Sequence, residues 1–190
     1  LEQVHAMVGG GSRHLVITAC QATGGIDGLD MDALLAVQLE HYEQNLAVHT
    51  RPFDGVIEAL DALRAMGLRI AVATNKGEKL ARLLLEKLGL LNYMEFVIGG
   101  DTLGAGRAKP NPDMLLAMMK ACGTQNAIFV GDTAYDLRAA KAAAIPSILM
   151  DFDADADLSH LEADHIIHHF SALPDLIKAL NDGTRPQSAD

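Results

Sequence analysis

The segment from residue 127 to residue 144, AIFVGDTAYDLRAAKAAA, constrains the fold more than any other part of the chain. Its four opening apolar residues are too few for a helix and include branched and aromatic side chains, so they predict a buried strand. Gly131 interrupts this run, and Asp132 and Asp136 follow at the start of an alanine-rich helical pattern. In a parallel α/β sheet this position is the carboxyl end of a strand, where ligands bind.

The two carboxylates of this segment suggest a cation site. Asp132 and Asp136 would repel each other unless a cation lay between them, and the nearest base, Arg138, points to another helix face. Oxygen ligands at this spacing suit Mg²⁺, which keeps several waters and accepts one or two protein carboxylates. The alternative is structural: Asp132 caps the helix, and Asp136 is solvated in its first turn, where the helix dipole favours it.

Beyond residue 55 the sequence alternates between helical and strand patterns. Apolar residues at helical spacing predict helices, and short runs rich in branched residues predict strands. Strands that alternate with helices indicate an α/β fold with a Rossmann-like parallel sheet and flanking helices. The predicted helices cover residues 56–66, 78–88, 112–121, 134–143 and 173–180, and the predicted strands cover 68–74, 96–98, 127–130, 147–150 and 165–167.

The amino-terminal part contains helical patterns only. Residues 1–50 therefore predict a small all-helical unit, in which the three glycines at 9–11 form a turn and Ser12 caps the next helix. A segment with Pro and Gly, TRPFDG, separates this unit from the α/β core, which we place at residues 51–180. Residues 181–190 predict a flexible tail.

Composition narrows the classes of function. Hydrophobic residues make up 49% of the chain, enough for a real core. The net charge of −10 argues against nucleic acid as a partner. Cys20 and Cys122 are too few for a disulfide framework, so we expect a reducing cytoplasm. No apolar run approaches the ~20 residues that span a bilayer, so we expect no membrane association.

Two further polar positions complete an ordered set of motifs. Thr74 and Asn75 lie at the end of the 68–74 strand, and Lys109 precedes Pro-Asn-Pro, which holds it extended. A hydroxyl at a strand end, a lysine before Pro-x-Pro and then Gly-Asp-x-x-x-Asp resemble motifs two, three and four of the haloacid dehalogenase (HAD) superfamily. Within it, the chain is most similar to the phosphoglycolate phosphatase branch, over nearly its whole length.

This resemblance implies an enzyme that hydrolyses a small phosphorylated metabolite through an aspartyl-phosphate. It implies that Thr74, together with the amides of Asn75 and Lys76, binds phosphate oxygens at a helix start. Lys109 would screen the repulsion between nucleophile and phosphate. Asp132 would bind Mg²⁺ directly, and Asp136 directly or through water.

The resemblance also implies that residues 1–50 are a cap over the active site. Gly10 and Gly11 would then lie on the cap face near the substrate, and Arg13 is a candidate for binding a substrate carboxylate. The alternative is an ordinary interhelical turn with a solvated arginine. We expect the protein to act as a monomer or a homodimer.

The chain departs from the family pattern in one respect. The family's nucleophile is an aspartate in Asp-x-Asp-Gly-Thr after a first strand, and this motif is absent from the sequence. We expect it on an upstream segment on the order of 40 residues long. Its strand would lie between the strands that end at Thr74 and Val130. The acidic residues 151–157 imitate the motif but lack Gly-Thr, and we expect them to form a surface loop.

Three other interpretations stay open. The chain could be a catalytically incompetent module that binds phosphate and metal only, or a metal-free haloacid dehalogenase, which the paired acids disfavour. It could also be an ordinary doubly wound domain in which Asp132 and Asp136 serve helix capping. The histidines at 165, 168 and 169 fit exposed imidazoles at a strand end better than a metal site.

Overall fold

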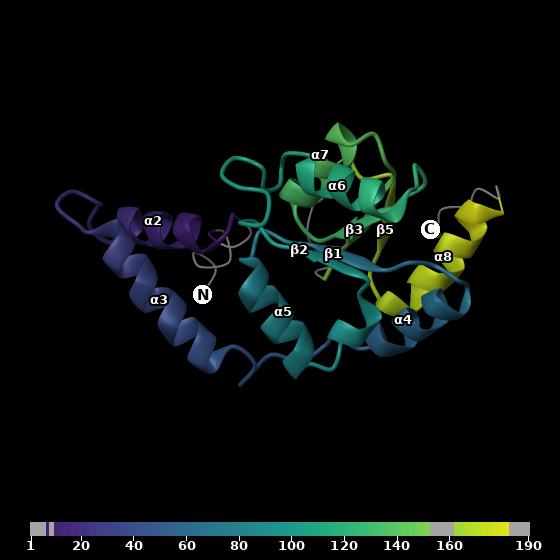
Figure 1. Cartoon of the computed structure of the whole chain (residues 1–190), viewed down its shortest axis with the longest axis horizontal. Coiled ribbons are helices and arrows are strands. Elements are labelled where there is room, and N and C mark those ends of the chain that lie inside the picture. The colour runs from purple at the N-terminus through teal and green to yellow at the C-terminus, as the bar shows by residue number, and fades with distance from the viewer. Residues whose placement is uncertain (1–6, 8–9, 153–161, 183–190) are drawn as a thin grey trace.

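The computed structural model describes residue 7, residues 10–152 and residues 162–182. Within these ranges the chain alternates helices and strands beyond residue 55, as the sequence predicts (Figure 1). The helices are α2 (Ser12–Thr23), α3 (Met31–Asn45), α4 (Val56–Ala65), α5 (Glu78–Lys87), α6 (Asp113–Cys122), α7 (Ala134–Ala142) and α8 (Leu173–Asn181). The strands are β1 (Ala71–Ala73), β2 (Phe96–Ile98), β3 (Phe129–Gly131), β4 (Ser147–Met150) and β5 (His165–Ile167), and two 3-10 turns span Leu91–Tyr93 and Phe170–Ala172.

The strands form two parallel sheets in the described part of the chain. β1 pairs with β2 in one sheet, and the other has the order β3-β4-β5. Each pair is in parallel register, for example Val72 with Val97 and Val130 with Ile148. The predicted α/β fold is therefore observed, but its sheet is divided between β1 and β3.

The strands are shorter than the sequence predicts in two places. The run 68–74 predicts seven residues of strand, whereas β1 spans only Ala71–Ala73. In the described part of the chain β1 pairs only with β2, and this pairing covers three residues. The predicted strand 127–130 is shifted to Phe129–Gly131, because pairing begins opposite Ser147.

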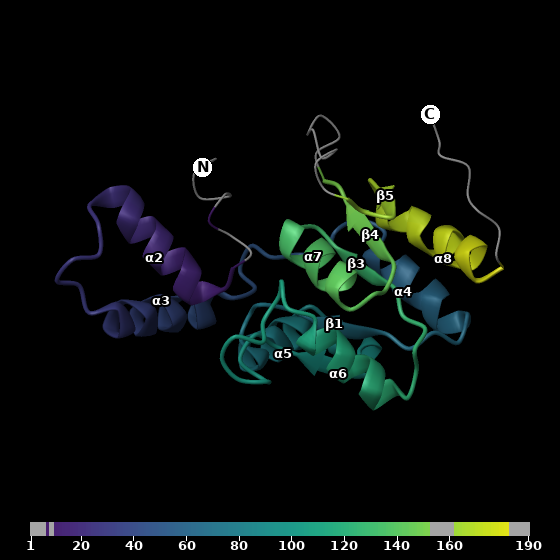
Figure 2. The same ribbon diagram turned by 90° about the horizontal axis from the view of Figure 1, so that it is seen from above.

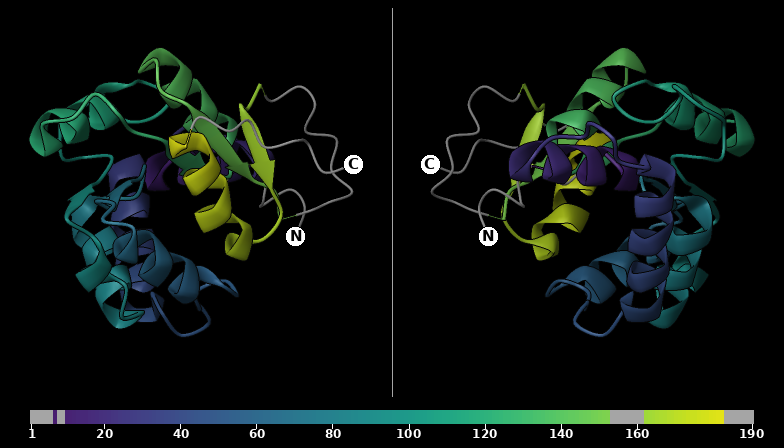
Figure 3. Two further views of the ribbon diagram at one scale, coloured as in Figure 1. Left: turned by 90° about the vertical axis from the view of Figure 1, so that its right-hand side faces the viewer. Right: turned by 90° about the vertical axis from the view of Figure 1, so that its left-hand side faces the viewer.

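Helices cover both faces of the sheets. Figure 1 shows α6 and α7 above the strands and α4 and α5 below them, and the end-on views of Figure 3 show the same layers. Ala139 and Ala140 of α7 are completely buried, which explains the alanine-rich sequence: small side chains let the helix approach β3 and β4 closely. Met114 of α6 packs in the same apolar cluster. A second cluster joins Ile148 of β4 to α4 and α8.

Helices α2 and α3 pack against each other at one end of the molecule, apart from the α/β layers (Figure 2). Neither helix contains a fully buried residue, although Leu46, directly after α3, is only 2% exposed. Asp30 caps α3 by accepting hydrogen bonds from the amides of Asp32 and Ala33. No helix in the described part of the chain is both long and apolar enough to cross a membrane.

Candidate active site

The loop between β3 and α7 is held by a capping box. Thr133 is the N-cap of α7, and its amide and hydroxyl both donate to Oδ2 of Asp136, at 3.0 and 2.5 Å. Asp136 is only 4% exposed, so the predicted alternative of a solvated Asp136 and a capping Asp132 is wrong. The Thr-x-x-Asp pattern in the sequence was the signal for this arrangement.

Gly131 makes room for the Asp136 side chain. A Cβ atom at Gly131 would lie 2.3 Å from Asp136 Cβ and 2.4 Å from its Cγ. A side chain at this position is therefore incompatible with the buried position of Asp136.

Lys109 forms a buried ion pair with Asp136. Its Nζ lies 2.5 Å from Asp136 Oδ1 and also donates to the backbone carbonyl of Ala73, at 2.9 Å. The same ammonium lies 5.3 Å from the ring centroid of Phe129 on β3. Lys109 thus stands between the two sheets, and it joins the end of β1 to the start of α7.

The backbone of Lys109 is anchored by Asn75. The side-chain amide of Asn75 donates to the Lys109 carbonyl at 3.0 Å, and its Oδ1 accepts from the Lys109 amide at 2.9 Å. The Asn75 side chain therefore hydrogen-bonds to both the N–H and the C=O of Lys109, much as a neighbouring strand would. This pair explains how residues 34 positions apart meet at the end of β1.

The loop after β1 packs tightly against the loop after β2. The Thr74 amide donates to the backbone carbonyl of Ile98 at 3.0 Å, and the Thr74 hydroxyl accepts from the Lys76 amide at 3.2 Å. Asp101 reaches across from the second loop and accepts a hydrogen bond from the amide of Glu78, the first residue of α5, at 2.8 Å. The sequence offered no signal for this contribution of Asp101.

Asp132 is the exposed acid of the pair. Surrounding protein atoms partly desolvate its carboxylate, and the negative charge of Asp136 adds repulsion; both effects raise the pKa of Asp132. A backbone hydrogen bond and the charge of Lys109 partly offset them. A bound cation would relieve both effects. The two acids therefore differ in role: Asp136 is engaged at both oxygens, whereas Asp132 is accessible.

This donor set fits a hydrated Mg²⁺ ion. Asp132 offers an accessible carboxylate, and the engaged carboxylate of Asp136 suits contact through water. In the described residues, no three His, Cys, Asp or Glu side chains come close enough to hold a metal by themselves. An ion that retains most of its water ligands needs no such cluster.

The cap residues predicted to face the substrate lie in two different settings. Gly11 is the N-cap residue of α2, and a Cβ atom there would lie 3.2 Å from the backbone oxygen of Asn75. Gly10 instead lies against the ring of His14. Arg13 is exposed and forms an ion pair with Asp32 at the start of α3. The structure thus brings Gly11 to the site loop and directs Arg13 to its neighbouring helix.

The acidic segment after β4 is only partly described. We expect residues 151–157 at the surface, but Asp151 is buried, at 7% exposure, and its Oδ2 lies 3.3 Å from Nδ1 of His168. The surface expectation is therefore wrong for Asp151, because its amide pairs with the carbonyl of Ile167, the last residue of β5 and the one before this histidine. Residues 153–157 lie outside the described part of the chain.

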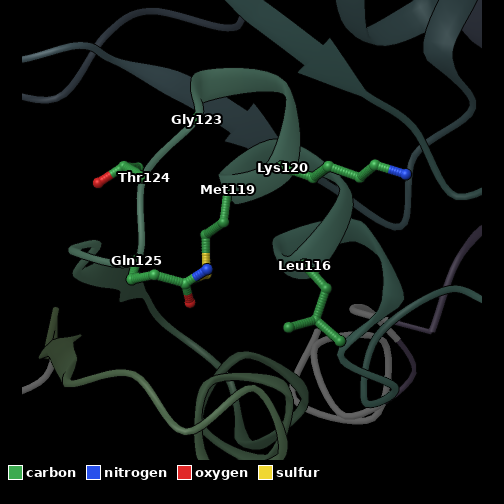
Figure 4. Close-up of a pocket in the computed structure, with 6 residues that line it drawn as sticks. All are labelled: Leu116, Met119, Lys120, Gly123, Thr124 and Gln125. Atoms are coloured by element: carbon green, nitrogen blue, oxygen red, sulfur yellow. The ribbon is translucent and has the colours of Figure 1, made fainter.

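Two surface pockets lie away from these residues. One, of about 400 Å³, is lined by the carboxyl end of α6 and the following turn (Figure 4). Lys120 points away from the others that line it, so no polar groups converge there. The second is lined by residues at the amino ends of β1 and β2, including Arg69 and Glu95. Neither includes a predicted site residue.

Comparisons with known proteins identify the family of the chain. Residues 13–150 match the sequence model of the haloacid dehalogenase-like hydrolase family. The chain is 41% identical over 147 residues to a phosphoglycolate phosphatase of Agrobacterium fabrum, covering 76% of this chain and 62% of that protein. It is 34% identical over 181 residues to a phosphoglycolate phosphatase of Rhodobacter capsulatus, covering 94% and 81%. It spans less than two thirds of the relatives from Agrobacterium and Thiobacillus denitrificans, 62% and 65%.

Solved structures share the fold. A predicted phosphoglycolate phosphatase from Haemophilus somnus superimposes with a TM-score of 0.80 at 24% identity, over 92% of this chain and 80% of that one. A HAD phosphatase from Thermococcus onnurineus gives a TM-score of 0.65 at 25% identity, over 77% and 68%. These similarities establish the same α/β architecture with helices on both faces.

Proposed function

Since the chain belongs to the haloacid dehalogenase-like hydrolase family, we propose that it is the greater part of a Mg²⁺-dependent phosphatase. Its substrate would be a small phosphorylated metabolite resembling phosphoglycolate, and the reaction would pass through an aspartyl-phosphate. One observation carries this proposal: Lys109 is buried against Asp136, beside the accessible acid Asp132 and the loop of Thr74. The names of its relatives support the substrate class.

The residues of the chain would divide the work of binding and charge compensation. The Thr74 hydroxyl and the backbone amides of its loop would donate hydrogen bonds to the phosphate oxygens. Lys109 would supply positive charge to the transferring phosphoryl group, and Asn75 would keep that lysine in position. Asp132 would hold the metal, with Asp136 contributing through water; when bound, Mg²⁺ neutralises charge that develops on the phosphate oxygens.

We place the attacking aspartate on a further parallel strand between β1 and β3. In the described residues β1 pairs only with β2, and β3 only with β4, so each has one edge without a strand partner. All three residues of β3 are only half-buried, although the strand is apolar. This exposure is consistent with a further strand that would cover its free edge. A strand in this position would direct its carboxyl end toward Lys109 and Asp132.

The same edges support a second candidate, a module that binds phosphate and metal without hydrolysis. The two functions separate in one pair of assays: release of inorganic phosphate from 2-phosphoglycolate, and the melting temperature with Mg²⁺ and with phosphate. Ligand-induced stabilisation with phosphate release supports the phosphatase, and stabilisation without release supports the binding module. Stabilisation by neither ligand contradicts both.

The metal assignment is tested by Asp132→Asn, with Asp27→Asn on the exposed part of the cap as the control. Mg²⁺ should raise the melting temperature of the parent and of Asp27→Asn but not of Asp132→Asn. Where phosphate release is measurable, it should be abolished in Asp132→Asn while the variant remains folded. Equal stabilisation of all three proteins by Mg²⁺ would show that Asp132 is not a ligand.

A further inference from the structure

Lys76 lies where the helical cap meets the site loop. Its ammonium donates to the hydroxyl of Tyr42 on α3 at 2.5 Å, and both residues are half-buried. Two residues before it is Thr74, whose hydroxyl is a proposed phosphate ligand. On the cap side, Gly11 lies against the backbone oxygen of Asn75. Lys76 therefore occupies the seam between the proposed phosphate site and the cap.

The charge of Lys76 has an unusual environment. Within the described part of the chain, Lys76 and Lys109 are the lysines that are not exposed. Lys109 is compensated by Asp136, but among the described residues no carboxylate lies within 4.0 Å of the Lys76 ammonium. The neighbouring Lys79 also crosses the seam, and it pairs with Glu43 at 2.7 Å. Withdrawing an ammonium from water without an acid is unfavourable, so the site favours an incoming anion.

Tyr42 and Lys76 together present a suitable arrangement for a carboxylate. The phenolic oxygen accepts a hydrogen bond from Lys76, so its own proton is available to donate elsewhere. The ammonium has two further N–H groups beyond the one directed at Tyr42. A carboxylate in this seam could therefore accept from both side chains, through charge-assisted hydrogen bonds.

We propose that Lys76, assisted by Tyr42, binds the second acidic group of the substrate, a carboxylate one carbon removed from the phosphate ester. This inference rests on the proposed phosphatase function. It identifies a specificity residue rather than a catalytic one, because Lys76 would select the acid end while the phosphate lies with Thr74 and Lys109. The substrate would then bridge the core and the cap.

A purely structural role for this pair makes a different prediction. If Lys76 only fastens the cap to the core, its loss would weaken every ligand in the site to a similar degree. If it binds a carboxylate, its loss would weaken only ligands that carry one. Ethyl phosphate separates the two roles, because it has a methyl group in place of the carboxylate of 2-phosphoglycolate.

The test is calorimetric binding of 2-phosphoglycolate and of ethyl phosphate to the full chain in the presence of Mg²⁺. The parent should bind 2-phosphoglycolate more tightly. Lys76→Met should weaken 2-phosphoglycolate by about tenfold or more, the range of a charge-assisted hydrogen bond, and leave ethyl phosphate within about threefold. Lys76→Arg should retain most of the preference. Lys79→Met, which removes the same charge from the same seam, should leave both affinities unchanged.

Tyr42→Phe provides a second variant that keeps the ring, and it should lose part of the preference. The inference is overturned if the parent prefers 2-phosphoglycolate and both variants weaken the two ligands equally, or weaken neither. It is also overturned if the parent does not distinguish the two ligands. If the parent binds neither ligand, the proposed function itself fails, which is a different result from loss of the preference alone.

Discussion

The ammonium of Lys109 lies 2.5 Å from the carboxylate of Asp136, and the two side chains are only 10% and 5% exposed. This ion pair is the physical link between a loop that follows β2 and a helix that follows β3. It fixes the position of the lysine, while Asn75 fixes its backbone. A buried pair of this kind contributes little net stability, but it is costly to break on one side.

Removing the acid should therefore destabilise the protein strongly. Asp136→Asn leaves the Lys109 charge buried without compensation and weakens the capping box with Thr133. We expect the free energy of unfolding to fall by about 3–5 kcal/mol, measured by urea denaturation.

The control is Asp113→Asn, which breaks the exposed pair between Arg107 and Asp113. It should cost less than about 1 kcal/mol, because water screens this pair. Equal losses in the two variants would show that the Lys109–Asp136 pair is not effectively buried.

Asn75→Asp tests the anchoring of the Lys109 backbone. The variant keeps an oxygen to accept from the Lys109 amide but replaces the donor to the Lys109 carbonyl with a second oxygen. We expect a loss of about 1–3 kcal/mol in unfolding free energy, because two acceptors then face each other. Asn111→Asp, on the loop that carries Lys109, replaces a donor to the Gly106 carbonyl in the same way but at an exposed position, where water can solvate both groups, so it should change stability much less. A neutral result for Asn75→Asp would contradict the proposed anchoring.

The raised pKa of Asp132 predicts a pH dependence of stability. An acid whose pKa is higher in the folded protein destabilises the fold as the pH rises through that pKa. Asp132→Asn should therefore be slightly more stable than the parent at neutral pH, and the difference should vanish below the ordinary pKa of 3.8. Melting temperatures across pH 3 to 8 would check this. A variant that is less stable than the parent at neutral pH would contradict it.

Saturating Mg²⁺ should reverse this comparison. A cation at Asp132 favours the ionised carboxylate, so the parent should gain stability at neutral pH and the variant should not. The gain of the parent should decline as the pH falls through the pKa of Asp132. An equal gain in parent and variant would place the metal elsewhere.

Gly99, directly after β2, lies against the loop that follows β1, and Gly77 in that loop lies against Asp101. The two glycines should tolerate substitution differently. A Cβ atom at Gly99 would lie 2.2 Å from the backbone nitrogen of Glu78, whereas one at Gly77 meets only the Asp101 carboxylate, at 3.1 Å. Gly99→Ala should lower the unfolding free energy by about 1–3 kcal/mol, because backbone must move. Gly77→Ala should stay within about 1 kcal/mol, since a side chain can shift. The reverse order would show that the two loops do not pack as described.

Local patterns in the sequence predicted the helices to within a few residues. Glycine stops, caps and apolar spacing determine where α4, α5 and α7 begin and end, because these are effects of the nearest neighbours in the chain. Strand lengths were less well predicted. The paired length of β1 depends on β2, which lies more than 20 residues away, and no local pattern contains that information.

The candidate site shows the same division. Thr74, Lys109, Asp132 and Asp136 could be selected from their positions at strand ends and before proline. The sequence did not reveal that Asp136 is buried while Asp132 is accessible, because burial depends on how Asp136 packs against Gly131 and on Lys109, which lies 27 residues away in the chain. The contacts of Asp101 and Tyr42 were also not predicted, since each joins residues that are distant in the chain.

The sequence by itself determined the alternation of helices and strands, the family, and the residues that carry charge at strand ends. These follow from local propensity and from spacing along one segment. Only the tertiary structure decided which acid is buried, which lysine pairs with a carboxylate and which lysine contacts the hydroxyl of Tyr42 instead. Those properties depend on desolvation and on partners distant in the chain, and both arise only when the elements pack together.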